Sequence, residues 1–195
     1  MKIKICGLFR KEDIEFVNEA NPDYIGFVFA KSRRQVTVNQ ASIFKKMLNQ
    51  NIKAVGVFVN APIQEIVSIV NQGIIDLIQL HGNEDQQYIS QLKQKTNLPI
   101  IKAISIQDFS HHYQDIDYYL FDASNAGSGR CFDWSLLPQI KKPFFLAGGI
   151  NLTNIDDALK IACYGIDLSS GVETNGYKDS QKINKIVRRV KYGKR

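Results

Sequence analysis

Residues 144–171 read FFLAGGINLTNIDDALKIACYGIDLSSG, and this stretch decides the fold class. Two short apolar runs, Phe144–Ala147 and Ile166–Ser169, have the composition of strands buried on both faces of a parallel sheet. Between them, apolar residues recur at the helical spacing i, i+3, i+4 and i+7, at Ile155, Ala158, Leu159 and Ala162. The stretch therefore predicts a strand–helix–strand unit in which glycine or serine follows each strand.

The same alternation of short apolar runs and amphipathic stretches continues along the whole chain. Eight strands are expected, at Lys2–Cys6, Tyr24–Phe29, Ala54–Val59, Ile74–Leu80, Ile100–Ile104, Tyr118–Phe121, Phe144–Ala147 and Ile166–Ser169. Eight strands with helical segments between them predict an α/β fold, the (β/α)8 TIM barrel. The segments after the fifth and sixth strands, around Ser110–Gln114 and Trp134–Ile140, are the weakest helices.

The length and the first turn also favour the barrel. A chain of 195 residues fits a single barrel domain, residues 1–195, with short loops, because about 250 residues is typical of this fold. The competing fold is a doubly wound open sheet, which has fewer strands and often a GxGxxG first turn. The first turn here reads Cys6-Gly7-Leu8, without that motif.

The formal net charge of +6 raises the possibility of a nucleic-acid-binding module. Such a module would interleave exposed aromatic residues along a basic face, whereas most Phe and Tyr residues fall in predicted strands and apolar stripes. We therefore expect a solvated helix face and no nucleic-acid partner, with a field that helps to attract an anionic substrate. Much of the positive charge lies near the end of the chain, at Lys185, Arg188, Arg189, Lys191, Lys194 and Arg195.

The cysteine pattern and the hydropathy favour a cytoplasmic protein. Cys6, Cys131 and Cys163 show no CxxC spacing, so neither a disulfide framework nor a zinc site is indicated. No stretch approaches the length of a membrane span, and the apolar run at the N-terminus is too short for a signal peptide. In a reducing compartment Cys6 remains a thiol, while Cys131 and Cys163 are interpreted as core residues.

In barrels of this type the active site lies at the C-terminal ends of the strands, and the loops after strands seven and eight commonly bind phosphate. Glycine and serine let backbone N–H groups approach a phosphate closely, and a helix N-terminus adds partial positive charge. Tight turns alone would also explain glycines at either place, but their occurrence at both strands favours a phosphate site. Its expected residues are Gly148, Gly149, Ser169, Ser170 and Gly171.

Three further strand ends carry side chains suited to acid–base chemistry or anion binding. Cys6 is either a core filler or a base or nucleophile, and Asp122 is either a loop-organising residue or a general acid. Either Arg33 or Arg34 is expected to clamp a substrate carboxylate, the other being a solvated charge. His81 is either a base or a packed strand-end residue. The pair His111-His112 is expected at the surface, with no third ligand to form a metal site.

Together the strand ends resemble those of the phosphoribosylanthranilate isomerase family. The matching pieces occur in order through essentially the whole chain, and their combination is far more specific than any one piece. They are Lys4-Ile5-Cys6-Gly7-Leu8, Gly26-Phe27-Val28-Phe29, Ser32-Arg33-Arg34, residues 55–60, Gln79-Leu80-His81-Gly82, Gly127-Ser128-Gly129-Arg130, Phe132-Asp133-Trp134, Ala147-Gly148-Gly149 and residues 167–173. One departure is Arg130, where the family commonly has lysine.

The resemblance implies an Amadori rearrangement in tryptophan biosynthesis, from N-(5'-phosphoribosyl)anthranilate to 1-(2-carboxyphenylamino)-1-deoxyribulose 5-phosphate. It implies that Asp122 is the general acid, Cys6 the general base, and Arg34 the partner of the anthranilate carboxylate. We also expect His81 and Asp167 to contact the substrate, and Gly148, Gly149, Ser169, Ser170 and Gly171 to hold its phosphate. No cofactor or metal is required for such proton transfers, and the enzyme is expected to be a monomer or a homodimer.

Two alternative enzymes use the same kind of barrel. A sugar-phosphate epimerase would need paired strand-end aspartates with histidine and metal ligands, and a Schiff-base aldolase would need a buried lysine, for which Lys102 is the candidate. The related isomerisation of histidine biosynthesis is less favoured, because that enzyme uses two aspartates where this chain has Cys6 and Asp122.

Overall fold

The computed structural model describes residues 1–109, 113–122 and 134–193. Within them, eight parallel strands pair in sequence order from β1 to β8, and β8 pairs with β1 to close the barrel. The strands are β1 (Lys2–Cys6), β2 (Tyr24–Val28), β3 (Lys53–Phe58), β4 (Leu77–Leu80), β5 (Ile100–Ser105), β6 (Tyr118–Asp122), β7 (Phe144–Leu146) and β8 (Gly165–Leu168). The predicted TIM barrel is confirmed.

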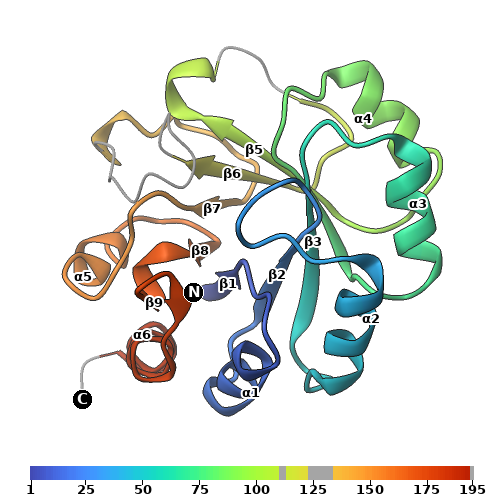
Figure 1. Cartoon of the computed structure of the whole chain (residues 1–195). Coiled ribbons are helices and arrows are strands. Elements are labelled where there is room, and N and C mark those ends of the chain that lie inside the picture. The colour runs from blue at the N-terminus through green and yellow to red at the C-terminus, as the bar shows by residue number, and fades with distance from the viewer. Residues whose placement is uncertain (110–112, 123–133, 194–195) are drawn as a thin grey trace.

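Helices surround most of the barrel (Figure 1). They are α1 (Lys11–Ala20), α2 (Val38–Met47), α3 (Ile63–Asn71), α4 (Gln86–Lys93), α5 (Ile155–Ala158) and α6 (Ser180–Tyr192). Beside β5 and β6 the described chain forms only the short 3-10 helices η1 (Ile106–Asp108) and η2 (Trp134–Leu136). The latter agrees with the weak helical signal around Trp134–Ile140, whereas residues 110–112 of the other weak segment are not described. A third, η3 (Ser170–Val172), precedes a small hairpin, β9 (Glu173–Thr174) and β10 (Tyr177–Lys178), which the sequence analysis did not anticipate.

Two expected elements are shorter than predicted. The fourth strand was expected from Ile74, but β4 begins at Leu77 because only residues 77–80 pair with a neighbouring strand. The stripe from Ile155 to Ala162 predicted a longer helix than α5. After Ala158 the chain tightens into i to i+3 hydrogen bonds, from Lys160 N–H to Asp157 O and from Ile161 N–H to Ala158 O.

The core has two layers. The inner layer fills the barrel interior with apolar side chains from alternate strand positions. Its residues are Tyr24, Val55, Leu77, Ile101, Ala103, Leu120, Phe145 and Ala147. A larger layer lies between the strands and the helices. There α6 buries the predicted stripe of Ile183, Ile186, Val187 and Val190. Because strand residues alternate in direction, Lys4, Cys6, Gln79 and Asp167 also face the barrel interior.

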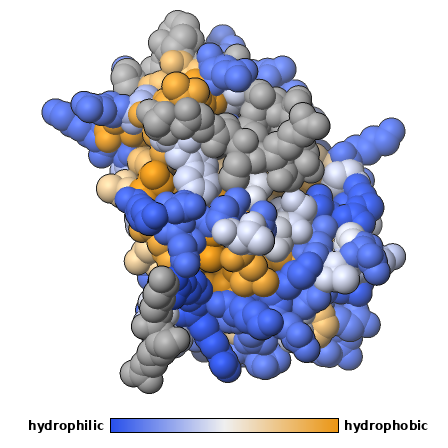
Figure 2. Space-filling model, turned by 90° about the vertical axis from the view of Figure 1, so that its left-hand side faces the viewer, coloured by the Kyte–Doolittle hydropathy of each residue, from blue (hydrophilic) through white to orange (hydrophobic). Residues whose placement is uncertain are grey.

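The outer surface is mixed. Figure 2 shows apolar patches among polar residues on the left-hand side of Figure 1, which includes α5 and α6. Lys185 and Arg188 lie on the exposed face of α6, and Arg189 forms an ion pair with Asp156. Among the described residues, no helix combines the length and apolar character needed to cross a membrane.

Candidate active site

Cys6 is the last residue of β1, and its side chain points into the barrel at the C-terminal end of the strands. It is 8% exposed. Gly26 of β2 stands opposite it in the strand register, and a Cβ atom at Gly26 would lie 2.6 Å from the Cys6 sulfur. Glycine at this position therefore gives the thiol its room. Gly7, with a φ of +77°, then turns the chain out of the barrel.

The thiol is surrounded by charged groups. Lys4 donates to Asp167 over 2.9 Å inside the barrel, and both residues are buried. Burial raises the pKa of the Cys6 thiol, the nearby Lys4 ammonium lowers it, and Asp167 raises it, so that the pKa lies above its ordinary value. Cys6 and Cys163 are both free thiols. The raised pKa favours the thiol form of Cys6 over the thiolate, a point that the sequence left open.

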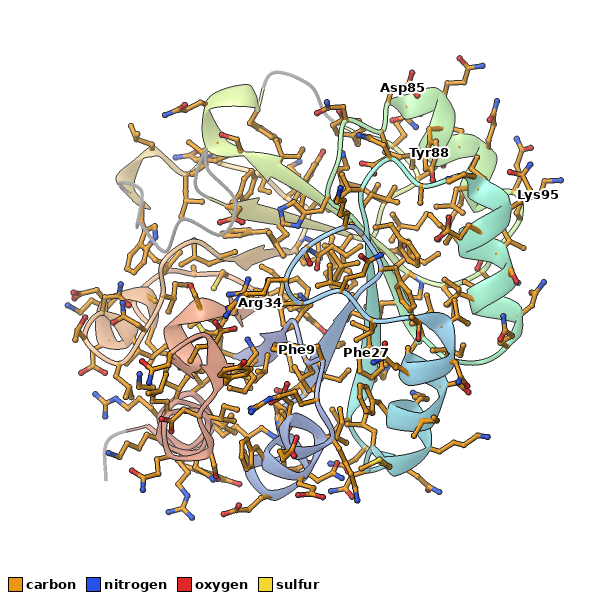
Figure 3. All side chains as sticks on the ribbon, in the orientation of Figure 1. Phe9, Phe27, Arg34, Asp85, Tyr88 and Lys95 are labelled. Carbon is orange, nitrogen blue, oxygen red and sulfur yellow. The ribbon has the colours of Figure 1, made fainter. Side chains whose placement is uncertain are left out.

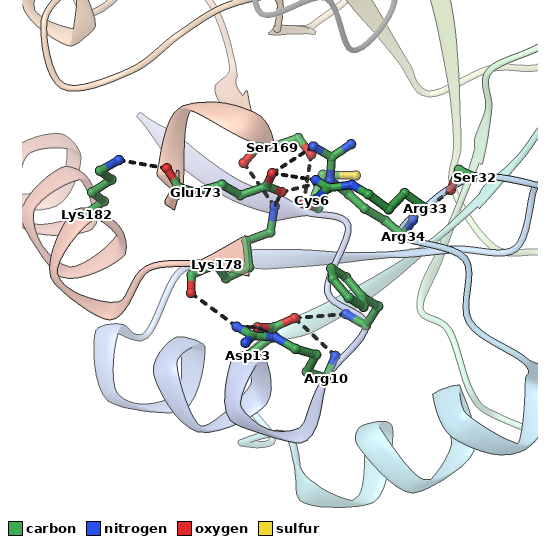
Figure 4. Close-up of polar contacts among 11 residues, drawn as sticks. Cys6, Arg10, Asp13, Ser32, Arg33, Arg34, Ser169, Glu173, Lys178 and Lys182 are labelled. Atoms are coloured by element: carbon green, nitrogen blue, oxygen red, sulfur yellow. Dashed lines mark hydrogen bonds and ion pairs between the residues drawn. The ribbon is translucent and has the colours of Figure 1, made fainter. Parts of the chain in front are cut away.

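Arg34 follows β2 (Figure 3), and its side chain folds back toward Cys6 (Figure 4). Its guanidinium forms a two-pronged pair with Glu173, Nε donating to Oε1 over 2.7 Å and Nη2 to Oε2 over 2.9 Å. Arg33 also donates to Glu173, over 3.1 Å, although its side chain is 54% exposed. Arg34, not Arg33, is the more enclosed of the two. A carboxylate of the chain itself holds Arg34 in a fixed orientation.

Lys178 of β10 completes this cluster, in which Glu173 is the shared acceptor. Its buried ammonium donates to Glu173 Oε1 over 2.7 Å and to the carbonyl oxygen of Ser169 over 2.9 Å. Burial alone would raise the pKa of Glu173, but the hydrogen bond from Arg34 and the charge of Lys178 lower it to about 2. Burial lowers the pKa of Lys178. The hairpin of β9 and β10 thus ties the loop after β8 to the loop after β2.

Asp122 is the last residue of β6, three strands away from Cys6 around the barrel. Its carboxylate lies 3.6 Å from Nε2 of His81, which directly follows β4. Nδ1 of His81 in turn lies 2.9 Å from the side-chain amide of Gln79, a buried residue of β4. The structure therefore brings together Asp122 and His81, two of the expected site residues, at the barrel mouth.

The loops after β7 and β8 pack against each other. Gly148 and Gly149 both have positive φ angles, +87° and +64°. A Cβ atom at Gly171 would lie 1.8 Å from the carbonyl oxygen of Ile150, so only glycine fits there. Ser170 begins the short helix η3, whose N-terminal N–H groups are of the kind that bind anions. The five residues of the expected phosphate site are thus grouped in two adjoining loops.

Other residues that the sequence analysis singled out lie away from the barrel mouth or outside the described part of the chain. Lys102 pairs with Glu84 over 2.8 Å, and both are buried. Because Ile101 and Ala103 face the barrel interior, Lys102 faces away from it, which argues against a Schiff-base role. The residues 110–112 and 123–133, with His111, His112, Arg130 and Cys131, lie outside the described part of the chain. Within the described part, no group of three or more His, Cys, Asp or Glu side chains is arranged to hold a metal ion.

Sequence reasoning missed three charged residues of this site, Lys4, Glu173 and Lys178. Lys4 had a detectable signal, since it is a charged residue inside an apolar strand and shares the face of Cys6. Glu173 and Lys178 depend on the hairpin of β9 and β10 and on contacts with distant loops. Only the folded chain brings these two residues to the mouth of the barrel.

Known proteins are similar to this chain in sequence and in fold. The family model for N-(5'phosphoribosyl)anthranilate (PRA) isomerase matches residues 3–189. The N-(5'-phosphoribosyl)anthranilate isomerase of Endomicrobium trichonymphae is 49% identical, over 97% of this chain and 96% of its own. The crystal structure of the Thermotoga maritima isomerase is similar with a TM-score of 0.88 at 29% identity, over 98% of both chains.

A further crystal structure has the isomerase in complex with reduced 1-(o-carboxyphenylamino)-1-deoxyribulose 5-phosphate. It matches with a TM-score of 0.82 at 27% identity, over 98% of both chains. The family resemblance is therefore confirmed along nearly the full length, in sequence and in fold. This chain belongs to the N-(5'-phosphoribosyl)anthranilate isomerase family.

Proposed function

We propose that this isomerase carries out its Amadori rearrangement with Cys6 as the general base and Asp122 as the general acid. The observation that carries the proposal is the position of the two side chains. Both end a strand at the mouth of the barrel, Cys6 on β1 and Asp122 on β6, so that a sugar bound between them presents different atoms to each. An aldose–ketose isomerisation needs two such groups and no redox cofactor.

The acid step opens the sugar ring. Asp122 gives a proton to the ring oxygen of the phosphoribosyl group as the bond between that oxygen and C1 breaks. The anthranilate nitrogen supplies the electron pair that forms the C=N bond, leaving a protonated Schiff base and the Asp122 carboxylate. His81 Nε2 lies 3.6 Å from the carboxylate of Asp122, just beyond hydrogen-bond distance, so a small shift of either side chain would bring the two into contact.

The base step moves the second proton. The Cys6 thiolate removes the proton from C2, and the electron pair of the C–H bond neutralises the Schiff base to give an enolamine. The enolamine then tautomerises to the ketone, its hydroxyl proton being lost as C1 gains one. Asp122 has lost one proton and Cys6 has gained one, so exchange with water resets both groups. Each group is expected to contribute about 10²–10⁴ in rate.

Two anion sites hold the substrate between these groups. We assign its phosphate to the N–H groups of Gly148, Gly149, Ser169, Ser170 and Gly171.

The anthranilate carboxylate is assigned to Arg34. Because Nε and Nη2 of Arg34 are bonded to Glu173, the carboxylate is expected at Nη1. His81 and Asp167 are the remaining proposed contacts, with Asp167 acting through the oxygen that does not accept from Lys4.

The test is growth of a tryptophan auxotroph that lacks this isomerase. The wild-type chain should restore growth, whereas the Cys6→Ser and Asp122→Asn variants should not. Cys163→Ser is the matched control, because Cys163 is also a free thiol but lies outside the barrel mouth, and this variant should support growth. Failure of the expressed wild-type chain would contradict the function, and growth with Cys6→Ser would contradict the role of the thiol.

We propose the cytoplasm as the location, because Cys6 must stay reduced to act as the base. A monomer or a homodimer remains the prediction for the oligomeric state. Light scattering of the purified protein tests it, and a larger assembly would contradict it.

A further inference from the structure

Two charged side chains lie inside the barrel beneath Cys6, where the proton transfers described above do not use them. Lys4 is two residues before Cys6 on β1, so both side chains point to the same face. Lys4 has no exposed surface. It pairs with Asp167 of β8, its neighbour in the strand register, over 2.9 Å.

Packing alone does not explain this ion pair. Inward positions on other strands of the barrel hold apolar side chains, among them Val55, Leu77 and Ile101. Burying two charges costs several kcal/mol per ion, and a hydrophobic replacement of a buried pair is often neutral or stabilising. Apolar residues at both positions 4 and 167 would therefore satisfy the barrel core. The position of the charge, next to the thiol, indicates a chemical role.

We propose that Lys4 is a positioning residue for the reaction: its buried ammonium stabilises negative charge on the Cys6 sulfur, and Asp167 holds the ammonium in place while limiting its effect. This inference rests on the proposed role of Cys6 as the base. In this proposal, the charge of Lys4 allows Cys6 to lose its proton even though the site is buried. Lys4 acts through Cys6 and does not itself contact the reacting atoms.

The groups that face Cys6 come from four elements: Lys4 on β1, Asp167 on β8, Lys178 on β10 and Arg34 in the loop after β2. Burial raises the pKa of the thiol most strongly, and among the charged groups Lys4 opposes it most. Lys178 acts in the same direction more weakly.

Lys178 and Arg34 both bond to Glu173, whose negative charge offsets theirs. Removal of Lys4 should therefore change the pKa of Cys6 more than removal of Lys178 or Arg34.

The proposal predicts effects of opposite sign at the two members of one ion pair. Lys4→Met removes a cation and should raise the pKa of Cys6, whereas Asp167→Asn removes an anion and should lower it. A purely structural role would give the same sign in both variants, because each breaks the same buried contact. The sign of the change therefore separates the two explanations.

The experiment measures the alkylation rate of Cys6 by iodoacetamide at pH 8, in the free enzyme. Peptide mass spectrometry distinguishes Cys6 from Cys131 and Cys163. Only the thiolate reacts, so each unit added to the pKa lowers the rate about tenfold. A single charge within about 4–6 Å changes a pKa by about one to three units. Lys4→Met should therefore react about 10–1,000 times more slowly than the wild type, and Asp167→Asn faster.

Lys102→Met is the matched control, because it also breaks a buried lysine–carboxylate pair, with Glu84, but on the outer face of the barrel. Its Cys6 should react within about twofold of the wild-type rate. Circular dichroism verifies that each variant is folded, since unfolding would expose Cys6 and speed its alkylation. Wild-type reactivity in folded Lys4→Met, or slower reaction in Asp167→Asn, would overturn the proposal.

If Lys4→Met fails to fold because Asp167 is left unpaired, the double variant Lys4→Met/Asp167→Asn provides the test. It leaves no buried charge without a partner, and its Cys6 should still react more slowly than in the wild type, since Lys4 has the larger effect. An equal or faster reaction would refute the role of Lys4. These rates are measured without substrate, so they stay interpretable even if Cys6→Ser retains activity and the base assignment fails.

Discussion

Replacing Glu173 by glutamine should show how much the ion pairs of this carboxylate contribute to the free energy of unfolding. Glutamine keeps the shape but removes the charge that Arg33, Arg34 and Lys178 share. The side chain of Glu173 is only 5% exposed, so water screens these contacts little. A pKa lowered from 4.5 to about 2 corresponds to roughly 3 kcal/mol of stability at pH 7. Glu173→Gln should therefore lose about 3 kcal/mol of unfolding free energy.

The stability difference between the wild type and Glu173→Gln should decrease as the pH falls. Because the pKa of Glu173 is lowered by folding, its contribution is complete above about pH 4.5 and is lost as the pH falls toward 2. Urea unfolding followed by circular dichroism should show the gap between wild type and Glu173→Gln narrowing by about 1 kcal/mol from pH 7 to pH 3.5.

The control is Glu15→Gln, which removes an exposed pair with Lys11 and should change stability by less than about 0.5 kcal/mol at either pH. A gap for Glu173→Gln below about 1 kcal/mol at pH 7, or one that stays constant with pH, would refute the reasoning.

Three further predictions concern the site. Gly171→Ala should lose at least about 2 kcal/mol of stability in urea unfolding, because its Cβ atom would lie 1.8 Å from the carbonyl oxygen of Ile150; an unchanged midpoint would contradict the packing of the two phosphate loops. Arg34→Ala should raise KM about tenfold or more by removing a charge-assisted contact, and an unchanged KM would exclude the carboxylate site. The pH profile of kcat/KM should contain an ionisation above about pH 8.5, because burial raises the pKa of Cys6; a profile without that ionisation would argue for another base.

The fold could be predicted because its signals are local and repeated. Each strand is a short apolar run, and each long helix carries an apolar stripe, such as that of α6. The order of strands in a parallel barrel then follows from the order in the chain. This order predicts that Cys6 and Asp122 lie at the same end of the barrel. Helix length was harder to predict, as α5 shows, because tight turns end that helix while its apolar stripe continues.

The electrostatics of the site could not be predicted in the same way. The pairing of Arg34 with Glu173 joins residues 139 positions apart, and that of Lys4 with Asp167 joins residues 163 positions apart. Neither pair leaves a local pattern in the sequence. Arg34 was correctly expected at the mouth, but the carboxylate that orients it was not. The resting form of Cys6 likewise depends on burial and on charges from distant strands.

The measurement that tests the central claim most directly is a single-turnover rate for Cys6→Ser with saturating N-(5'-phosphoribosyl)anthranilate. A hydroxyl in place of the thiol keeps the shape of the site but removes an accessible base. The account predicts that conversion slows by about 10²–10⁴ while substrate affinity and circular dichroism stay close to those of the wild type. Conversion within about threefold of the wild-type rate would show that Cys6 is not the base.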